Sequence, residues 1–339
     1  MKHVIVTDTH LGIKKGSDVY LRSNIALFDQ ICEYAGNNKI TSIIHAGDFF
    51  DTRKSLSLKV IDVSQTIMTT LEDSFNQIYL IIGNHDVFFK NELYPTSLSI
   101  FKEHDKVKII DDIFTLDNIT MIPWLFDVND FNYAKGKTDI CIGHFDINDI
   151  QMNVSGYTSL GYSLNKSDFK DFKLVLSGHY HMPSSTGNIR YLGSPMQFTF
   201  NEMGCTTGFY VLDSETLELE FIEFKYYPKH VIIKDTDSAK DFDIKDNVVK
   251  LVFTKDHGID RNTEIIRDIG IHNPHVLKID YYNLNDGMTD DVVDAEIQIR
   301  TKLEILFDFY EKSDLPDDIR YVILQKIVTN LYKEIKGEE

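Results

Sequence analysis

Five short polar motifs each follow an apolar run, and their residue types are those that bind transition metals. In chain order, the motifs are Asp8-Thr9-His10, Gly47-Asp48-Phe49-Phe50-Asp51, Gly83-Asn84-His85-Asp86, Gly143-His144 and Gly178-His179-Tyr180-His181. Their carboxylate, imidazole and amide groups together suit Mn²⁺, Fe²⁺ or Zn²⁺ and disfavour an all-oxygen Ca²⁺ site. Each motif alone has an ordinary explanation, such as a surface turn. Five of them in succession predict one shared metal site.

The apolar runs before these motifs predict the elements that hold them. Strand-like runs span 3–7, 40–46 and 78–82, and helical patterns lie between them near 25–36 and 57–72. This alternation is typical of a parallel α/β sheet, which builds its sites where the carboxyl ends of its strands meet. His45 lies inside the second run, and we interpret it as a core or supporting histidine.

The rest of the chain changes character twice. Strand-like runs continue to about residue 225 and predict a second sheet packed on the first, with helices outside. A small α+β unit follows, with strand-like runs at 248–253 and 276–282 around a helical pattern at 262–269. Apolar residues at helical spacing then predict two amphipathic helices joined near Leu315-Pro316. We therefore divide the chain into 1–225, 226–289 and 290–339.

Composition narrows the possible functions. The 339 residues include 35 Lys or Arg and 53 Asp or Glu, and the net charge of −18 disfavours a polyanionic partner for the chain alone. No apolar run approaches the ~18 residues that would span a membrane, and the N-terminus has no signal-peptide pattern. Three cysteines without CxxC spacing predict reduced thiols in a cytoplasmic protein. The chain has no GxxxxGKS/T phosphate loop, so it is not expected to hydrolyse ATP itself.

The order of the five motifs resembles that of the calcineurin-like metallophosphoesterase superfamily. That order is DxH, GDxxD, GNHD or GNHE, a lone histidine and then GHxH, and all five motifs occur within residues 1–225. The resemblance implies a four-layer α/β/β/α sandwich with two metal ions at the sheet edge. A small α+β capping domain and C-terminal helices would complete the α/β chain.

The resemblance also implies a role for each motif residue. The first metal's ligands would be Asp8, His10, Asp48 and His181, and the second metal's would be Asp48, Asn84, His144 and His179. Asp48 would therefore bridge the two ions. His85 would lie beside the substrate phosphate and protonate the leaving oxygen, while Asp51 and Asp86 would orient histidines.

Further strings are similar to those of the SbcD/Mre-type nuclease subunits. The opening DTHLG, which ends at Gly12, resembles that family's DxHLG, and GDFFD resembles its GDxFD. Ile122-Pro123-Trp124 and Tyr191-Leu192-Gly193-Ser194-Pro195 are also similar to its segments. The total length and short C-terminal part resemble the recombination endonuclease subunits of T4-like phages. Thr9 departs from the common tryptophan at a position that is not a ligand.

This resemblance implies an Mn²⁺-dependent DNA nuclease with 3′→5′ exonuclease and single-strand endonuclease activity in recombination, repair and replication. It also implies a Rad50-like ABC-type coiled-coil ATPase as partner, which would dock on residues 290–339, and a homodimer within a heterotetramer. Packing of those helices on their own domain is the alternative. Two other functions stay open: a DNA-end-binding and bridging subunit with limited nuclease activity, and a small-molecule nucleotide phosphodiesterase.

Two groups of surface candidates rest on weaker patterns. The basic candidates for contacts with DNA phosphates are Arg53, Lys54, Lys14, Lys15 and Lys90. The loop after GNHD supplies Phe88, Phe89, Leu93 and Tyr94, which suit either a homodimer interface or local packing. Arg53 is the strongest DNA candidate because it follows Asp51 by two residues. A phage protein of this kind would act in the cytoplasm of its bacterial host.

Overall fold

The computed structural model of the protein describes residues 1–148, 150, 164–255 and 257–281. The predicted helices at 290–339 lie outside these residues, as does the end of the predicted capping unit. The described residues all fall within one structural unit, Met1–Tyr282. Among them, no helix is both long enough and apolar enough to cross a membrane.

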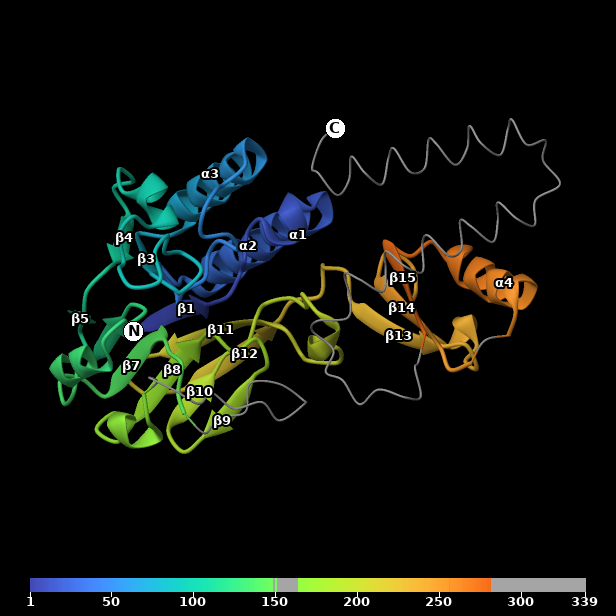
Figure 1. The fold of residues 1–339 in the computed structure, drawn as a ribbon. Coiled ribbons are helices and arrows are strands. Elements are labelled where there is room, and N and C mark those ends of the chain that lie inside the picture. Colours follow the sequence, from blue (N-terminus) through green and yellow to red (C-terminus); the bar gives the residue numbers. More distant parts are fainter. Residues whose placement is uncertain (149, 151–163, 256, 282–339) are drawn as a thin grey trace. The chain divides into compact units, whose positions relative to one another are not determined.

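The first sheet carries the first three motifs (Figure 1). Its strand order is β12 (Leu219–Glu223), β11 (Gly208–Asp213), β1 (Lys2–Val6), β2 (Ser42–His45), β3 (Gln77–Ile81) and β4 (Val107–Ile110). From β1 to β4 the strands are parallel, whereas β11 pairs antiparallel with both β1 and β12. The three predicted strands at the start of the chain are thus confirmed.

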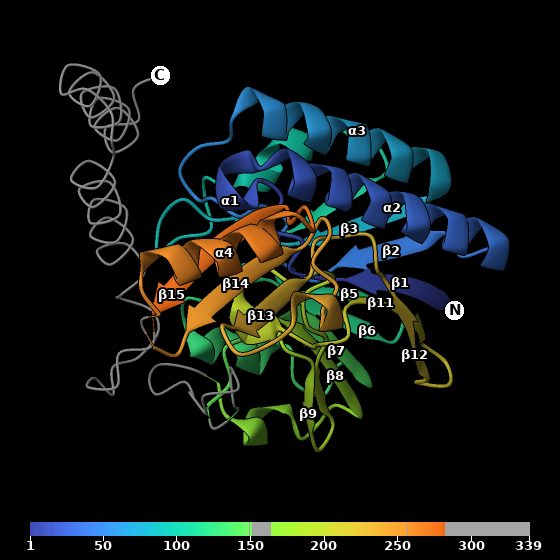
Figure 2. The same ribbon diagram turned by 90° about the vertical axis from the view of Figure 1, so that its right-hand side faces the viewer.

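Two long helices cover one face of this sheet. They are α2 (Asp18–Asn38) and α3 (Leu58–Ser74), preceded by the short α1 (Ile13–Gly16), and Figure 2 shows α2 and α3 running together above β1 to β3. Within β1, Val4 and Val6 are buried in the core under the helices, and Ile5 faces the core between the two sheets. The strand is therefore a continuous apolar run because both of its faces are covered.

The second sheet packs against the free face of the first. Its order is β5 (Phe114–Leu116), β6 (Ile119–Ile122), β7 (Ile140–His144), β8 (Leu174–Gly178), β10 (Ile189–Tyr191) and β9 (Ser184–Thr186). Ile142 and Leu176 meet Ile44 of the first sheet in the core between the sheets. On the outer face, Phe131 and Phe169 pack from the 3₁₀ helices η2 (Val128–Tyr133) and η3 (Lys166–Phe169). The four predicted layers are present, with 3₁₀ helices rather than α-helices in the described part of the fourth.

A third sheet follows the second. It holds the parallel strands β13 (His230–Lys234), β14 (Val248–Phe253) and β15 (Val276–Tyr281), and α4 (Ile259–Gly270) connects the last two. The remaining short elements are η1 (Ser97–Phe101), η4 (Phe200–Glu202) and η5 (Ala239–Asp241). Ile233, Leu251 and Ile269 form part of a separate small core. The predicted helix and two strands are confirmed, and β13 is an additional strand.

Candidate metal centre

The predicted ligands lie on five loops and strand ends at the carboxyl edge of the two sheets. The backbone amide of Asp8 donates to Gly47 O at 3.0 Å, and that of His10 donates to Asp48 O at 3.1 Å, which joins the loops after β1 and β2. Asp8, His10, Asp48 and His179 all have positive φ angles, between 42° and 90°. Such angles are uncommon outside glycine and cluster at functional sites.

Glycines allow the loops to approach closely at this edge. A Cβ atom on Gly83 would lie 2.2 Å from Oδ1 of Asp48 and 2.3 Å from its backbone nitrogen. A Cβ on Gly178 would lie 2.0 Å from Oγ1 of Thr7 and 2.8 Å from Oδ2 of Asp8. The glycines of the GNHD and GHxH motifs therefore make room for the carboxylates of the first two motifs.

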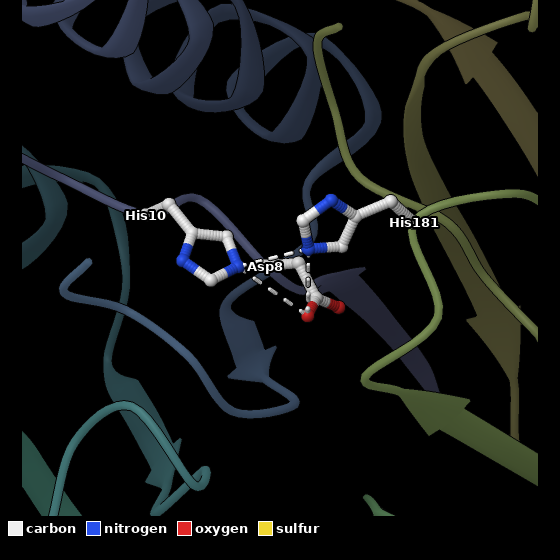
Figure 3. Close-up of side chains that lie close together, drawn as sticks. All are labelled: Asp8, His10 and His181. Carbon is white, nitrogen blue, oxygen red and sulfur yellow. Dashed lines mark hydrogen bonds and ion pairs between the residues drawn. The ribbon is translucent and has the colours of Figure 1, made fainter. Parts of the chain in front are cut away.

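Asp8, His10 and His181 form the first group of candidate ligands (Figure 3). The two Nε2 atoms are 3.0 Å apart, and each lies 3.9 Å from Oδ1 of Asp8. Asp8 is held in place because its carboxylate accepts hydrogen bonds from Thr7 Oγ1 at 2.7 Å and from the backbone amide of His179. This arrangement brings together residues 171 positions apart in the sequence.

Asp48, Asn84, His144 and His179 form the second group. Nε2 of His144 lies 3.2 Å from Oδ2 of Asp48 and 3.0 Å from Oδ1 of Asn84. Nδ1 of His179 is also 3.0 Å from that amide oxygen. The structure thus gathers all seven predicted ligand side chains in two adjoining groups.

Asp48 is common to both groups. Its Oδ2 faces His144 and also lies 3.8 Å from Nε2 of His10, while its Oδ1 accepts the backbone amide of His85 at 2.8 Å. Burial alone would raise the pKa of Asp48 and lower that of His144, but their contact reverses both effects. The pKa of Asp48 falls well below its usual range, and the pKa of His144 rises to about 9.

The chemistry of these donors fits divalent metal ions. In His144, Nδ1 is placed to donate to the carbonyl of Ala46 at 2.9 Å, so Nε2 is the nitrogen that would bind a cation, which would displace the proton that Asp48 favours there. In His181, Nδ1 lies 3.0 Å from Oε1 of Glu202, so Nε2 is again the nitrogen that would bind a cation. Two imidazole nitrogens 3.0 Å apart, with carboxylates around them, favour a cation at this point.

His85 and Asp51 lie beside the first group. Nδ1 of His85 is placed to donate to the backbone carbonyl of Asp51 at 2.7 Å, and its ring meets that of His10 edge-on at 4.9 Å. The carboxylate of Asp51 is 3.5 Å from Nδ1 of His10. The backbone carbonyl of Asp51 is thus placed to orient His85, whereas its carboxylate lies near His10 without a hydrogen bond to Nδ1. The role of that carboxylate in orienting a histidine stays a prediction.

Asp86 has a different environment from the one that the sequence suggests. Its fully buried carboxylate accepts the backbone amides of Phe49, Phe50 and Gly83 rather than orienting a histidine. Burial and the nearby charge of Asp48 raise its pKa to about 7. Asp86 therefore ties the GDFFD loop to the GNHD loop, because backbone amides on both need an acceptor.

Sequence reasoning missed Glu202 and gave Trp124 no role. Glu202 is 4% exposed and holds His181, whereas the indole of Trp124 lies against the rings of His179 and His144 with centroids 5.2 and 6.1 Å away. Thr199 to Glu202 match a T-x-x-E capping box, which the structure contains, so that signal predicts only a helix start.

The histidine inside β2 has a structural environment. His45 is 2% exposed, its Nε2 lies 2.9 Å from Oγ1 of Thr9, and its ring packs on Phe49. Burial lowers its pKa to about 3, so it is neutral at ordinary pH. The interpretation of His45 as a core or supporting histidine is confirmed.

The weaker surface candidates lie at or near the protein surface. Four of the basic residues are exposed and the fifth, Arg53, is half-buried; the four are Lys14, Lys15, Lys54 and Lys90. Phe88, Phe89 and Tyr94 are 40%, 43% and 51% exposed, and Leu93 packs on the helix-covered core. Their suggested roles in DNA binding and dimerisation stay predictions.

Comparisons with known proteins identify a family and several similar proteins. The sequence model of the family described as calcineurin-like phosphoesterase matches residues 1–183, which contain all five motifs. Exonuclease subunit 1 of Enterobacteria phage T4 is 30% identical over 352 residues, which cover 98% of this chain and 99% of that protein. The SbcD subunit of the nuclease SbcCD of Staphylococcus epidermidis is 25% identical over 260 residues, or 65% and 67% of the two chains. A solved structure described as a novel archaeal phosphodiesterase aligns at 15% identity and a TM-score of 0.36, covering 66% of this chain and 100% of that one.

Proposed function

The chain belongs to the calcineurin-like phosphoesterase family, and from this premise we propose that it is an Mn²⁺-dependent DNA nuclease with a two-metal site. The observation that carries the proposal is the convergence of seven predicted ligands at one sheet edge. The match to an exonuclease subunit over almost the whole chain favours DNA over other phosphodiesters. Its proposed activities are 3′→5′ exonuclease and single-strand endonuclease cleavage.

The proposed ligand sets follow the two groups of side chains. Asp8, His10, Asp48 and His181 would hold one ion, and Asp48 would share the other with Asn84, His144 and His179. When bound, two divalent ions neutralise a phosphodiester and lower the pKa of a water molecule. The mixed nitrogen and oxygen donors suit Mn²⁺.

His85 is the proposed acid for the leaving oxygen. Because its Nδ1 is occupied by the carbonyl of Asp51, the proton for the leaving oxygen would come from Nε2. The backbone amide of His85 also binds Asp48, so the same residue links the acid to the shared ligand. Asp51 completes the arrangement by orienting His10.

We further propose that the chain acts as the nuclease subunit of a larger assembly. Both nuclease relatives carry the word subunit in their names, which supports a partner for this chain. The proposed partner is a Rad50-like ABC-type ATPase that would dock on the helices predicted for 290–339, with residues 226–289 capping the site. A chain lacking 290–339 should fail to pull down the ATPase, and a surviving complex would refute the docking proposal.

The same assembly would contain two copies of the chain and bind DNA. Exposure of Phe88, Phe89 and Tyr94 supports a homodimer interface near the GNHD loop. Arg53, with the four exposed lysines predicted above, would contact DNA phosphates. The setting proposed for the assembly is recombination, repair and replication in the cytoplasm of a bacterial host.

The decisive experiment measures Mn²⁺-dependent cleavage of end-labelled duplex and single-stranded DNA by the purified chain, alone and with its ATPase. We expect cleavage that chelation abolishes. Hydrolysis of bis(p-nitrophenyl) phosphate without DNA cleavage would favour the small-molecule phosphodiesterase. DNA binding and bridging without hydrolysis of either substrate would favour the structural subunit.

A further inference from the structure

A cavity of ≈ 470 Å³ lies next to the candidate metal centre and has no part in the mechanism above. Its apolar lining includes Trp124, Phe126 and Tyr133, from the loop after β6 and from η2. Its volume falls in the range of sites for small ligands. Phe126 and Tyr133 are 37% and 71% exposed, so the aromatic lining is reachable from solvent.

Trp124 connects this cavity to the metal centre. Its backbone amide donates to Ile82 O at 2.8 Å, which ties the loop after β6 to the end of β3, two residues before Asn84. Trp124 is one of the residues that line the cavity, and its indole also lies against the rings of His179 and His144, as described above. A group that enters the cavity is therefore next to the residue whose indole packs on two candidate ligands.

The charges on the lining select the kind of group that fits. Asp111, Asp112 and Asp130 line the cavity, with Lys137 as the basic residue among the lining side chains. Such a set repels a phosphate, but its carboxylates accept hydrogen bonds from the N–H groups of a nucleobase. An aromatic wall with acceptors around it matches a flat, neutral group that has a π face and N–H donors.

We propose that this cavity is a nucleobase subsite in which Trp124 stacks on a base next to the scissile phosphate. The inference rests on the proposed nuclease function and adds a residue that holds the substrate through its base. A nucleotide with its phosphate at the metal centre carries its base on the attached sugar, and Trp124 adjoins that centre. Base stacking tolerates any sequence, as a nuclease of general specificity requires.

The first test uses fluorescence and needs no hydrolysis. Trp124 is the only tryptophan in the chain, so its emission reports on this cavity and on the adjoining histidines of the candidate metal centre. Deoxyribose 5-phosphate controls for a phosphate bound at that centre. In Mg²⁺, we expect dAMP to quench the emission in a saturable way and deoxyribose 5-phosphate not to do so. Equal quenching by both compounds, or none by dAMP, would overturn the subsite. If dAMP causes no quenching, a basic side chain of a protein partner would fit the acidic lining of the cavity better.

The second test compares intact DNA with DNA that lacks one base beside the scissile bond. Removal of the stacked base should slow cleavage by the unmodified protein about 5- to 150-fold, the range for one base–aromatic stack. In Trp124→Ala, intact DNA should be cleaved slowly, and removal of the base should cause little further loss. Damage to the metal centre would instead slow both substrates equally and preserve their ratio, and that result would refute the proposal.

Tyr226→Ala supplies a matched control, because Tyr226 is an aromatic side chain that is 69% exposed and lines a different surface pocket. It should retain the full effect of base removal. The two tests also separate the subsite from the nuclease function. Base-dependent quenching without DNA cleavage would refute the nuclease function and retain the subsite. DNA cleavage at a rate that does not depend on the base would support the nuclease function and refute the subsite.

Discussion

Glu202 provides the sharpest test of how the metal centre is supported. Its Oε1 accepts from Nδ1 of His181 at 3.0 Å and from Oγ1 of Thr199 at 3.1 Å, and its Oε2 accepts the backbone amides of Phe198 and Thr199 at 2.5 and 3.4 Å. Burial raises the pKa of this carboxyl, but His181 and the other donors hold it below its usual range. Every neighbour donates, so the site requires an acceptor at both oxygens.

Glu202→Gln keeps the shape of the side chain but turns one acceptor into a donor. The backbone amides of Phe198 and Thr199 cannot change role, so the amide oxygen should stay with them. The new NH₂ group would then face Thr199, whose hydroxyl can rotate, and His181, which can adopt its other tautomer. That tautomer carries its proton on Nε2, the atom directed toward Asp8 and His10. The substitution should therefore weaken metal binding more than it weakens the fold.

The expected loss is about 10- to 100-fold in Mn²⁺ affinity at the group of Asp8, His10 and His181. Because each buried donor keeps a partner, the free energy of unfolding without metal should fall by no more than about 1 kcal/mol. Isothermal titration with Mn²⁺ and denaturant unfolding in EDTA measure the two effects. Unchanged affinity at both metal positions in a folded variant would refute the argument.

Asp235→Asn is the matched control for Glu202→Gln. Asp235 also holds a histidine, with Nε2 of His257 at 2.6 Å from its Oδ2, and it accepts from Thr254 as well. Asp235 follows β13 and His257 follows β14, so the pair belongs to the third sheet and lies away from the candidate ligands in the sequence and in the sheet order. Asp235→Asn should leave Mn²⁺ affinity unchanged. If both substitutions lower Mn²⁺ affinity equally, the loss is a general response to removing a carboxylate–histidine pair.

Three further predictions follow from particular contacts. Gly83→Ala places a Cβ atom 2.2 Å from Oδ1 of Asp48, and hydrolysis of a phosphodiester reporter should fall by at least about 100-fold, whereas Gly36→Ala, with open space around it, should be neutral. His85→Ala should abolish hydrolysis and retain metal; loss of metal by elemental analysis would contradict its role as the acid. Burial lowers the pKa of His3 to about 4, below the unfolded value of 6.5, so its stabilising effect is present above pH 6.5 and is lost as the pH falls toward 4. Between pH 7 and 5 the free energy of unfolding should fall by about 2 kcal/mol through His3. His3→Gln, which keeps a partner for Ser42, should reduce this dependence of the unfolding free energy on pH, measured by denaturant unfolding.

The convergence of the candidate ligands could be predicted from the sequence because each motif directly follows a single strand. Asp8, Asp48 and Asn84 each follow a buried strand by a few residues, and parallel strands bring such positions to one edge. His144 and His179 follow strands of the second sheet, and the family resemblance implied which ion each candidate ligand would bind. Their packing against the first sheet depends on the core that Ile5 and Ile142 share.

The supporting residues could not be predicted because their partners are distant and have no fixed spacing. Glu202, in η4, is separated from His181 in the sequence by β9 and β10, and Trp124 reaches His179 because β6 and β8 both flank β7 in the second sheet. Asp86 illustrates the opposite case, because its place in GNHD predicted a histidine partner. In the structure its carboxylate is enclosed by backbone amides, whose positions depend on the conformation of two loops.

The net charge of −18 is compatible with the proposed cleavage of DNA once the positions of the acidic residues are considered. Asp8, Asp48 and Asp86 are buried and bonded within the site, where bound cations would offset the first two. The last 50 residues hold 13 Asp or Glu against 7 Lys or Arg, so they carry −6 in the segment assigned to protein contact. The remaining acidity still opposes DNA, so binding by the chain alone should be weak and fall steeply with salt. The proposed ATPase must then supply most of the affinity for DNA. This chain would supply the metal centre that is proposed to cleave the DNA.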